Sequence, residues 1–153
     1  MKPNTQTHTS HKNEVLVGIE AQEEVFETEN ELTPAKEHLE RGQSLDVPLI
    51  LQKCVPCHGG ILPLAGPELR RLQAQLNNWS VWEDHHLLKT FKFSDFASAL
   101  AFVNKVGEIA EGQGHHPNIF LSWGMVKIEL WTHAIEGLSL NDFILAAKID
   151  QIK

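Results

Sequence analysis

The sequence predicts an α+β domain of two layers, in which a four-stranded antiparallel sheet carries three helices on one face. The chain has 153 residues, of which 42% are apolar, and this suits a single domain with a hydrophobic core. From Pro67 onward the residue pattern runs helix, strand, strand, helix, strand, strand, helix. Short turns join the strands in pairs, and such hairpins imply antiparallel pairing. The predicted order is therefore αββαββα.

The first helix and hairpin are expected between Pro67 and residue 93. Proline suits the first turn of a helix. The leucines that follow recur at helical spacing: Leu69, Leu72 and Leu76. Asn77 and Asn78 end the helix, and strands are predicted at 79–83 and 87–93. The apolar residues expected on one face of the second strand are Leu87, Phe91 and Phe93.

A long central helix is expected from Ser94 or Asp95, either of which is a good N-cap, to about Glu111. The residues predicted to form its buried stripe are Phe96, Ala99, Leu100, Val103, Val106 and Ala110. Glu111 then lies at the C-terminal end of the helix, where the helix dipole disfavours a carboxylate. A locally disfavoured charge beside histidines points to function.

The last three elements follow from the same patterns. Strands are predicted at 118–123 and 125–132, with Gly124 in the turn between them and Trp123 on the same face as Ile119 and Leu121. Trp131 is expected to be exposed on the other face, which favours an oligomer. Ser139 and Asp142 resemble a capping box at the start of the final helix.

Two regions of different composition divide the chain. Residues 1–44 are rich in Glu and poor in large apolar residues, so we expect an acidic, disordered extension before a domain at 45–153. The net charge is −7 and no basic stripe is present, which argues against a nucleic-acid partner. No apolar run approaches the ~20 residues of a membrane helix, and no hydrophobic signal core is seen. We therefore expect a soluble, cytoplasmic protein without a membrane partner.

The loop-like lead-in at 45–66 contains Cys54-Val-Pro-Cys57-His58, which allows three functional interpretations and a structural one. Cys-x-x-Cys-His is the attachment signature of c-type haem, but no export signal precedes it. It could be half of a zinc site, although two further ligands are required. It could also be a redox pair, although no βαβ pattern precedes it. A structured surface turn is the simplest interpretation.

The candidate site centres on Glu111-Gly-Gln-Gly-His115-His116-Pro117, with His133 eighteen residues after His115. Imidazole can donate and accept a proton near neutral pH, so three histidines form a natural device for proton transfer. Pro117 disfavours the helical region for His116, and the glycines permit the reversal that ends the helix. A second pair, His85-His86, lacks this frame and is expected to be structural or solvated.

This spaced motif, with Trp123, His133 and Asp142 after it, resembles the signature of pterin-4a-carbinolamine dehydratases. The segments Phe91-Lys-Phe-Ser-Asp-Phe96 and Gly137-Leu-Ser-Leu-Asn-Asp142 are also similar to that family, over roughly residues 45–153. The resemblance implies the αββαββα fold, a homodimer or homotetramer, and no metal or organic cofactor. One candidate functional partner is an aromatic amino acid hydroxylase.

The resemblance also implies a reaction: loss of water from a 4a-hydroxytetrahydropterin to give the quinonoid dihydropterin, in support of tetrahydrobiopterin recycling. Under this hypothesis His115 and His133 are the acid/base pair, and Glu111 orients or polarises a histidine. His116 and Pro117 are assigned to the binding of the pterin. Trp123 either lines the pterin pocket or packs in the core. For Asp142 the simple role is helix capping.

Two further functions stay open at this point. A metal hydrolase could use His115, His116 and His133 as three ligands, although adjacent histidines on an extended chain point in different directions. A non-catalytic dimerisation or regulatory module is also possible, because animal relatives of the family serve as dimerisation partners of a transcription factor. Retention of all three histidines favours catalysis.

Overall fold

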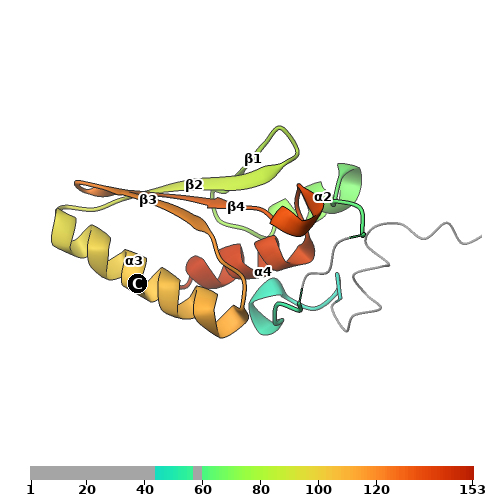
Figure 1. Ribbon diagram of the computed structural model, residues 1–153, viewed down its shortest axis with the longest axis horizontal. Coiled ribbons are helices and arrows are strands. Elements are labelled where there is room, and N and C mark those ends of the chain that lie inside the picture. The colour runs from blue at the N-terminus through green and yellow to red at the C-terminus, as the bar shows by residue number, and fades with distance from the viewer. Residues whose placement is uncertain (1–43, 57–59) are drawn as a thin grey trace, which may run out of the picture. The chain divides into compact units, whose positions relative to one another are not determined.

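The structure is a computed structural model that describes residues 44–56 and 60–153 (Figure 1). The predicted acidic extension, apart from its last residue, lies outside the described residues. The same holds for Cys57, His58 and Gly59. Within the described ranges, no helix is long and apolar enough to cross a bilayer.

The predicted α+β class is confirmed. Four strands form one antiparallel sheet in the order β1-β2-β4-β3. The strands are β1 (Ser80–Trp82), β2 (His86–Lys92), β3 (Asn118–Ser122) and β4 (Met125–Leu130). The α-helices are α2 (Gly66–Gln73), α3 (Phe96–Gln113) and α4 (Leu140–Ile149), and two 3₁₀ turns are η1 (Leu49–Leu51) and η2 (His133–Ile135). Figure 1 shows α3 and α4 lying against the same side of the sheet.

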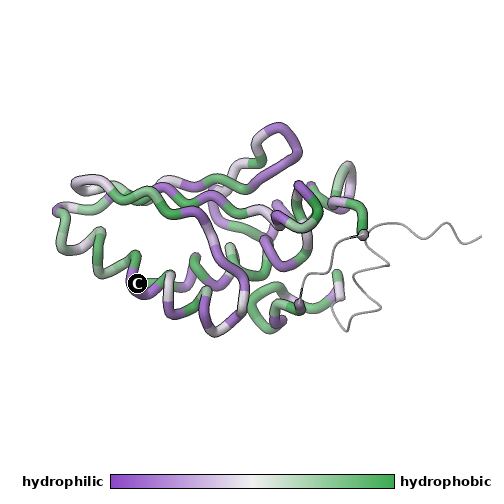
Figure 2. Tube along the Cα trace, viewed as in Figure 1, coloured by the Kyte–Doolittle hydropathy of each residue, from purple (hydrophilic) through white to green (hydrophobic). Residues whose placement is uncertain are grey.

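One face of the sheet forms the floor of the hydrophobic core. In β4, Val126, Ile128 and Leu130 are fully buried, and the register pairs Leu130 with Leu87 of β2. Alternate residues of a strand share a face, so these three point the same way. All three α-helices contribute to the same core cluster, and the helices therefore cover this one face. Figure 2 shows hydrophilic residues at the turn between β1 and β2, away from the core.

Local signals at both ends of α3 match the prediction, but its buried face differs. Asp95 is the N-cap and accepts a hydrogen bond from the Ser98 N–H at 2.7 Å, while Gly114 ends the helix with φ of 61°. The buried residues are Ala99, Phe102, Val106 and Ala110. Phe96 and Leu100 are exposed, contrary to the prediction. At about 100° per residue these two lie well off the line of the four buried positions, so Phe102 takes the core place assigned to them.

The two tryptophans near the last hairpin also correct the sequence-based picture. Trp123 is 74% exposed in the turn between β3 and β4, so it is not a core residue. Strand β4 ends at Leu130, and Trp131 is half-buried where exposure was expected. Its indole is covered in part by the rings of His85, His86 and His133, with ring centroids 4.5–6.0 Å away.

A buried ion pair explains the charged residue on the core side of β2. Lys89 pairs with Ile128 in the register, and its Nζ lies 2.6 Å from Oδ1 of Asp150, with side chains only 12% and 7% exposed. Asp150 also accepts a hydrogen bond from Nε1 of Trp79 at 3.0 Å. A buried charge is tolerated when it is paired and hydrogen-bonded, and this pair fastens the end of α4 to the sheet.

Candidate functional site

The three histidines of the predicted site line one pocket. Its volume is about 240 Å³. The residues that line it are Gly114, His115, His116, Trp131, Thr132, His133 and Ala134. His115 and His116 come from the connection between α3 and β3, and His133 begins η2 directly after β4. The fold thus joins two histidine-bearing segments that are separated in the sequence.

The local chain geometry at His115 and His116 follows from the residues around them. Gly114 adopts the left-handed conformation, which costs glycine little, and its N–H bonds to main-chain oxygens of the last helical turn. The His115 N–H donates to the Ala110 carbonyl at 3.2 Å. Pro117 keeps His116 out of the helical region, and β3 begins one residue later. The two side chains therefore leave the main chain at a fixed break between helix and strand.

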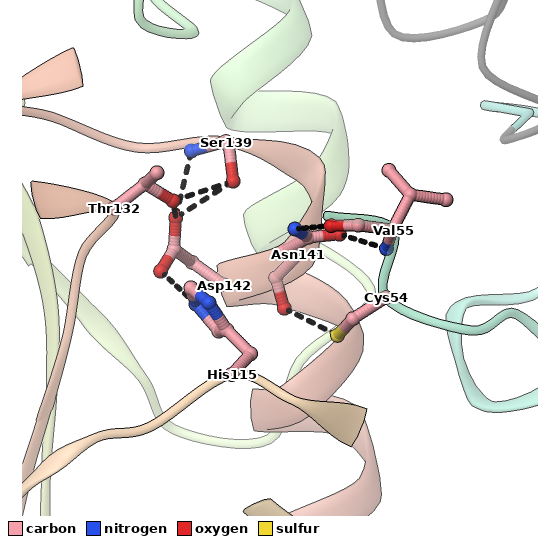
Figure 3. A network of polar contacts seen from close by, with 7 residues as sticks. All are labelled: Cys54, Val55, His115, Thr132, Ser139, Asn141 and Asp142. Atoms are coloured by element: carbon pink, nitrogen blue, oxygen red, sulfur yellow. Dashed lines mark hydrogen bonds and ion pairs between the residues drawn. The ribbon is translucent and has the colours of Figure 1, made fainter. Parts of the chain in front are cut away.

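His115 is held by a buried carboxylate. Its Nε2 lies 2.7 Å from Oδ1 of Asp142, His115 is 8% exposed, and Asp142 is completely buried (Figure 3). Such a contact fixes both the orientation of an imidazole and the nitrogen that carries its proton. When Nε2–H donates to the carboxylate, the lone pair of Nδ1 remains available as a proton acceptor.

The second oxygen of Asp142 completes the network. Oδ2 accepts hydrogen bonds from the Ser139 N–H at 2.7 Å and from Oγ1 of Thr132 at 2.8 Å. The predicted capping box of α4 is confirmed. The contact to His115 is the part that sequence reasoning missed, because the two residues are 27 positions apart and no local pattern links them. Asp142 therefore caps a helix with one oxygen and orients a histidine with the other.

Glu111 contacts His116 and not the buried histidine. Nε2 of His116 lies 2.8 Å from Oε1 of Glu111, at the end of α3, and both side chains are mostly exposed. An exposed pair of this kind adds little to stability. Glu111 can still hold the His116 ring against the pocket. The site thus contains one solvent-facing pair, His116 with Glu111, and one buried pair, His115 with Asp142.

His133 and Trp131 form another side of the pocket. Their ring centroids are 4.5 Å apart. The pair His85 and His86 approaches the indole of Trp131 as well, with centroids at 5.9 and 6.0 Å. No pattern in the sequence indicated this contact, because the pairing of β2 with β4 that brings His85 and His86 to Trp131 is a long-range feature.

The two remaining predicted residues do not line this pocket. Pro117 is half-buried directly after His116. Trp123 lies beyond the far end of β3, and the five residues of that strand span about 17 Å at roughly 3.3 Å each. In the single chain Trp123 is thus remote from the three histidines. Among the described residues, no group of three or more His, Cys, Asp or Glu side chains is arranged to hold a metal ion.

Comparisons with known proteins point to one family. Residues 63–152 match the family model described as pterin 4 alpha carbinolamine dehydratase. A protein from Rubrobacter xylanophilus, provisionally named a pterin-4-alpha-carbinolamine dehydratase, is 52% identical over 101 residues, which cover 66% of this chain and 94% of its own. A similarly named protein from Rickettsia canadensis is 53% identical over 100 residues, covering 65% and 92%.

A solved structure agrees with the sequence relatives. The crystal structure of a transcriptional coactivator/pterin dehydratase from Brucella melitensis superposes with a TM-score of 0.55 at 29% sequence identity. The match covers 57% of this chain and 95% of that one. The fold and the sequence therefore lead to the same group of proteins.

Proposed function

Because the chain belongs to the pterin 4 alpha carbinolamine dehydratase family, we propose that it removes water from a 4a-hydroxytetrahydropterin and releases the quinonoid dihydropterin. The observation that carries the proposal is the convergence of His115, His116 and His133 on one pocket. The reaction moves two protons: one goes to the leaving hydroxyl, which departs as water, and one leaves a ring nitrogen. Positioned imidazoles contribute about 10²- to 10⁴-fold to such a step.

In this mechanism His115 and His133 are the acid/base pair. The Asp142 carboxylate, 2.7 Å from Nε2 of His115, keeps that ring in place and leaves Nδ1 to exchange a proton with the pterin. His133 is exposed at the other side of the pocket and exchanges the second proton. One histidine is thus preorganised by a buried partner, while the other is free to meet the substrate.

His116 and Trp131, which line the pocket, and Pro117 beside it support binding. His116, held by Glu111 at 2.8 Å, and the adjacent Pro117 bind the edge of the pterin. The indole of Trp131 offers a flat aromatic surface to the planar ring system. The proposed chemistry needs no metal, so turnover should survive exhaustive chelation. Activity that is lost on chelation and restored only by zinc or iron would contradict it.

The decisive experiment is dehydratase turnover with a synthetic 4a-hydroxytetrahydropterin, measured for the protein and for single alanine variants of the histidines. Loss of His115 or His133 should lower kcat and kcat/KM together, because each acts in the transition state. Loss of His116 should raise KM more than it lowers kcat. Unchanged kinetics per folded molecule for both His115→Ala and His133→Ala, with lower Tm, would defeat the assignment.

We also propose that the protein is a homodimer or homotetramer and that it serves an aromatic amino acid hydroxylase. Large apolar side chains are exposed on both sides of the domain, at Leu100 on α3 and at Trp82 and Phe120 on the open sheet face. Pairing of chains through either face would remove these apolar side chains from water. Light scattering of the purified protein tests the oligomeric state, and a monomer at micromolar concentration would contradict the proposed homodimer or homotetramer.

A second candidate function is a regulatory interaction module. The relative from Brucella melitensis is described as both a transcriptional coactivator and a pterin dehydratase. A module of that kind would tolerate loss of the histidines, so the His115→Ala and His133→Ala variants would keep partner binding while they lose turnover. Absence of any turnover in the unaltered protein would favour this second function.

A further inference from the structure

Gln113 and Asn141 occupy special places beside the buried pair of His115 and Asp142. Gln113 is the last residue of α3, two positions before His115. Asn141 lies in the first turn of α4, directly before Asp142. Gln113 bonds to the main chain of Cys54, and Asn141 bonds to the main chain of Val55. Both partners lie outside the residues 63–152 that match the family model. The lead-in segment therefore touches both helices that carry the candidate site.

The contacts form a two-sided clamp. The Val55 N–H donates to Oδ1 of Asn141 at 3.1 Å, and Nδ2 of Asn141 donates to the Val55 carbonyl at 2.8 Å (Figure 3). On the other side, the Cys54 N–H donates to Oε1 of Gln113 at 3.1 Å. Asn141 is buried, and a buried amide without a hydrogen-bond partner costs free energy. Any movement that breaks its bonds to Val55 is therefore unfavourable.

The same segment is anchored to the body of α4 further back. Leu49 is buried in the core, and Nζ of Lys148 donates to the Ile50 carbonyl at 3.1 Å. The segment is thus fixed to α4 at two places and to the end of α3 at one. It therefore links the end of α3 to α4.

We infer that Gln113 and Asn141 are positioning residues, which use the main chain of Cys54 and Val55 to hold His115 and Asp142 at hydrogen-bonding distance. The inference rests on the proposed function for its catalytic consequence. Geometry at a reacting centre is strict, and a displacement of about 1 Å can lower a rate by about 10²-fold. Removal of the clamp should therefore reduce the rate although neither residue touches the pocket.

The test compares four variants. Gln113→Ala and Asn141→Ala remove the two sides of the clamp, whereas Gln113→Glu keeps an oxygen acceptor for the Cys54 N–H. Gln52→Ala is the control, because Gln52 is a buried amide of the same segment whose Nε2 donates to the carbonyls of Ser44 and Val47 at 2.6 and 2.7 Å. Within residues 44–56 and 60–153 it has no hydrogen bond to a histidine. For each variant kcat, KM and Tm are measured, and nitrogen NMR reports the tautomer and exchange of the His115 ring.

We expect Gln113→Ala and Asn141→Ala to lower kcat by about 10- to 100-fold with KM near that of the unaltered protein, and to broaden or shift the His115 ring signals. Gln113→Glu should restore both properties, and Gln52→Ala should lower Tm alone. If the two alanine variants behave like Gln52→Ala, the inference is wrong.

The test still decides if one variant fails to fold or if the dehydratase assay shows no turnover. Should Asn141→Ala fail to fold, the Gln113→Ala and Gln113→Glu pair, which differs by one hydrogen bond, decides alone. Should the unaltered protein show no dehydratase turnover, the proposed function fails, but the His115 signals still show whether the clamp positions that ring. Unperturbed His115 signals in Gln113→Ala would then overturn the inference.

Discussion

Replacement of Asp142 by Asn separates the two tasks of this carboxylate. Oδ2 accepts from Ser139 and Thr132, whereas Oδ1 faces Nε2 of His115. In the variant, the amide oxygen can take the place of Oδ2 and keep the helix cap. The amide nitrogen then faces His115 and donates to Nε2, which moves the ring proton to Nδ1. The nitrogen proposed to accept a proton from the pterin is thereby occupied.

The magnitudes follow from the hydrogen bonds. Bonds to a charged group are worth about 1.5–3 kcal/mol and neutral ones about 0.5–1.5 kcal/mol, so the Asn variant should lose roughly 1–3 kcal/mol of stability. Ala at this position removes the carboxylate that accepts from the His115 ring, the Thr132 hydroxyl and the Ser139 main chain, all of which are buried. At about 1–3 kcal/mol each, that loss is a large part of the roughly 5–15 kcal/mol that stabilises a domain. The Asn variant should stay folded, whereas the Ala variant should be close to unfolding.

The assay combines urea unfolding with steady-state turnover. We expect Asp142→Asn to lower kcat by about 10²- to 10⁴-fold, the usual contribution of a positioned acid or base. The matched control is Asp150→Asn, which alters another buried carboxylate of α4 that binds Lys89 and Trp79, away from the pocket. It should lower stability and leave kcat unchanged. If Asp142→Asn keeps the full kcat, the pairing of Asp142 with His115 is only structural.

Three smaller predictions test the fold and the lead-in. Hydrogen bonds from Ser98, chiefly from its main-chain N–H, hold the pKa of Asp95 below its ordinary value of 3.8. The contribution of the ionised Asp95 cap to stability is therefore complete above pH 3.8 and is lost as the pH falls through the folded-state pKa. The Tm deficit of Asp95→Ala should shrink in that acidic range, and a deficit independent of pH would contradict the capping argument. Gly137→Ala should lower Tm, because a Cβ would lie 2.6 Å from Cβ of Pro63. Gly107→Ala in α3, where a Cβ would meet no neighbouring group within 4 Å, should raise the free energy of unfolding by about 0.5–1 kcal/mol. Equal effects of the two variants would refute the packing argument. Cys54→Ser should keep near-normal turnover, since the clamp uses main-chain groups and a serine hydroxyl can replace the thiol that donates to the Asn141 carbonyl at 3.6 Å; a large fall with the fold intact would show a role for the thiol.

The ends and turns of the elements were predictable because their causes are local. Asp95 caps α3 and Gly114 ends it through residues within one turn, and the capping box of α4 spans only Ser139 to Asp142. The antiparallel pairing within each hairpin also followed from its short turn, whereas the pairing of β2 with β4 is a long-range feature. The buried face of α3 was predicted less well, because Phe96, Leu100 and Phe102 are all apolar and only the position of the sheet decides which of them is covered.

For the site, the sequence alone determined the break in the chain at His115-His116-Pro117 and the candidate histidines, because these depend on residue type and short spacing. Tertiary structure alone decided that His133 shares their pocket, that Asp142 holds His115, and that Trp123 lies in an exposed turn. It also brought Cys54 and Val55 to Gln113 and Asn141, across 59 and 86 positions. Such contacts have no periodicity along the chain, because they arise only when helices and strands pack in three dimensions.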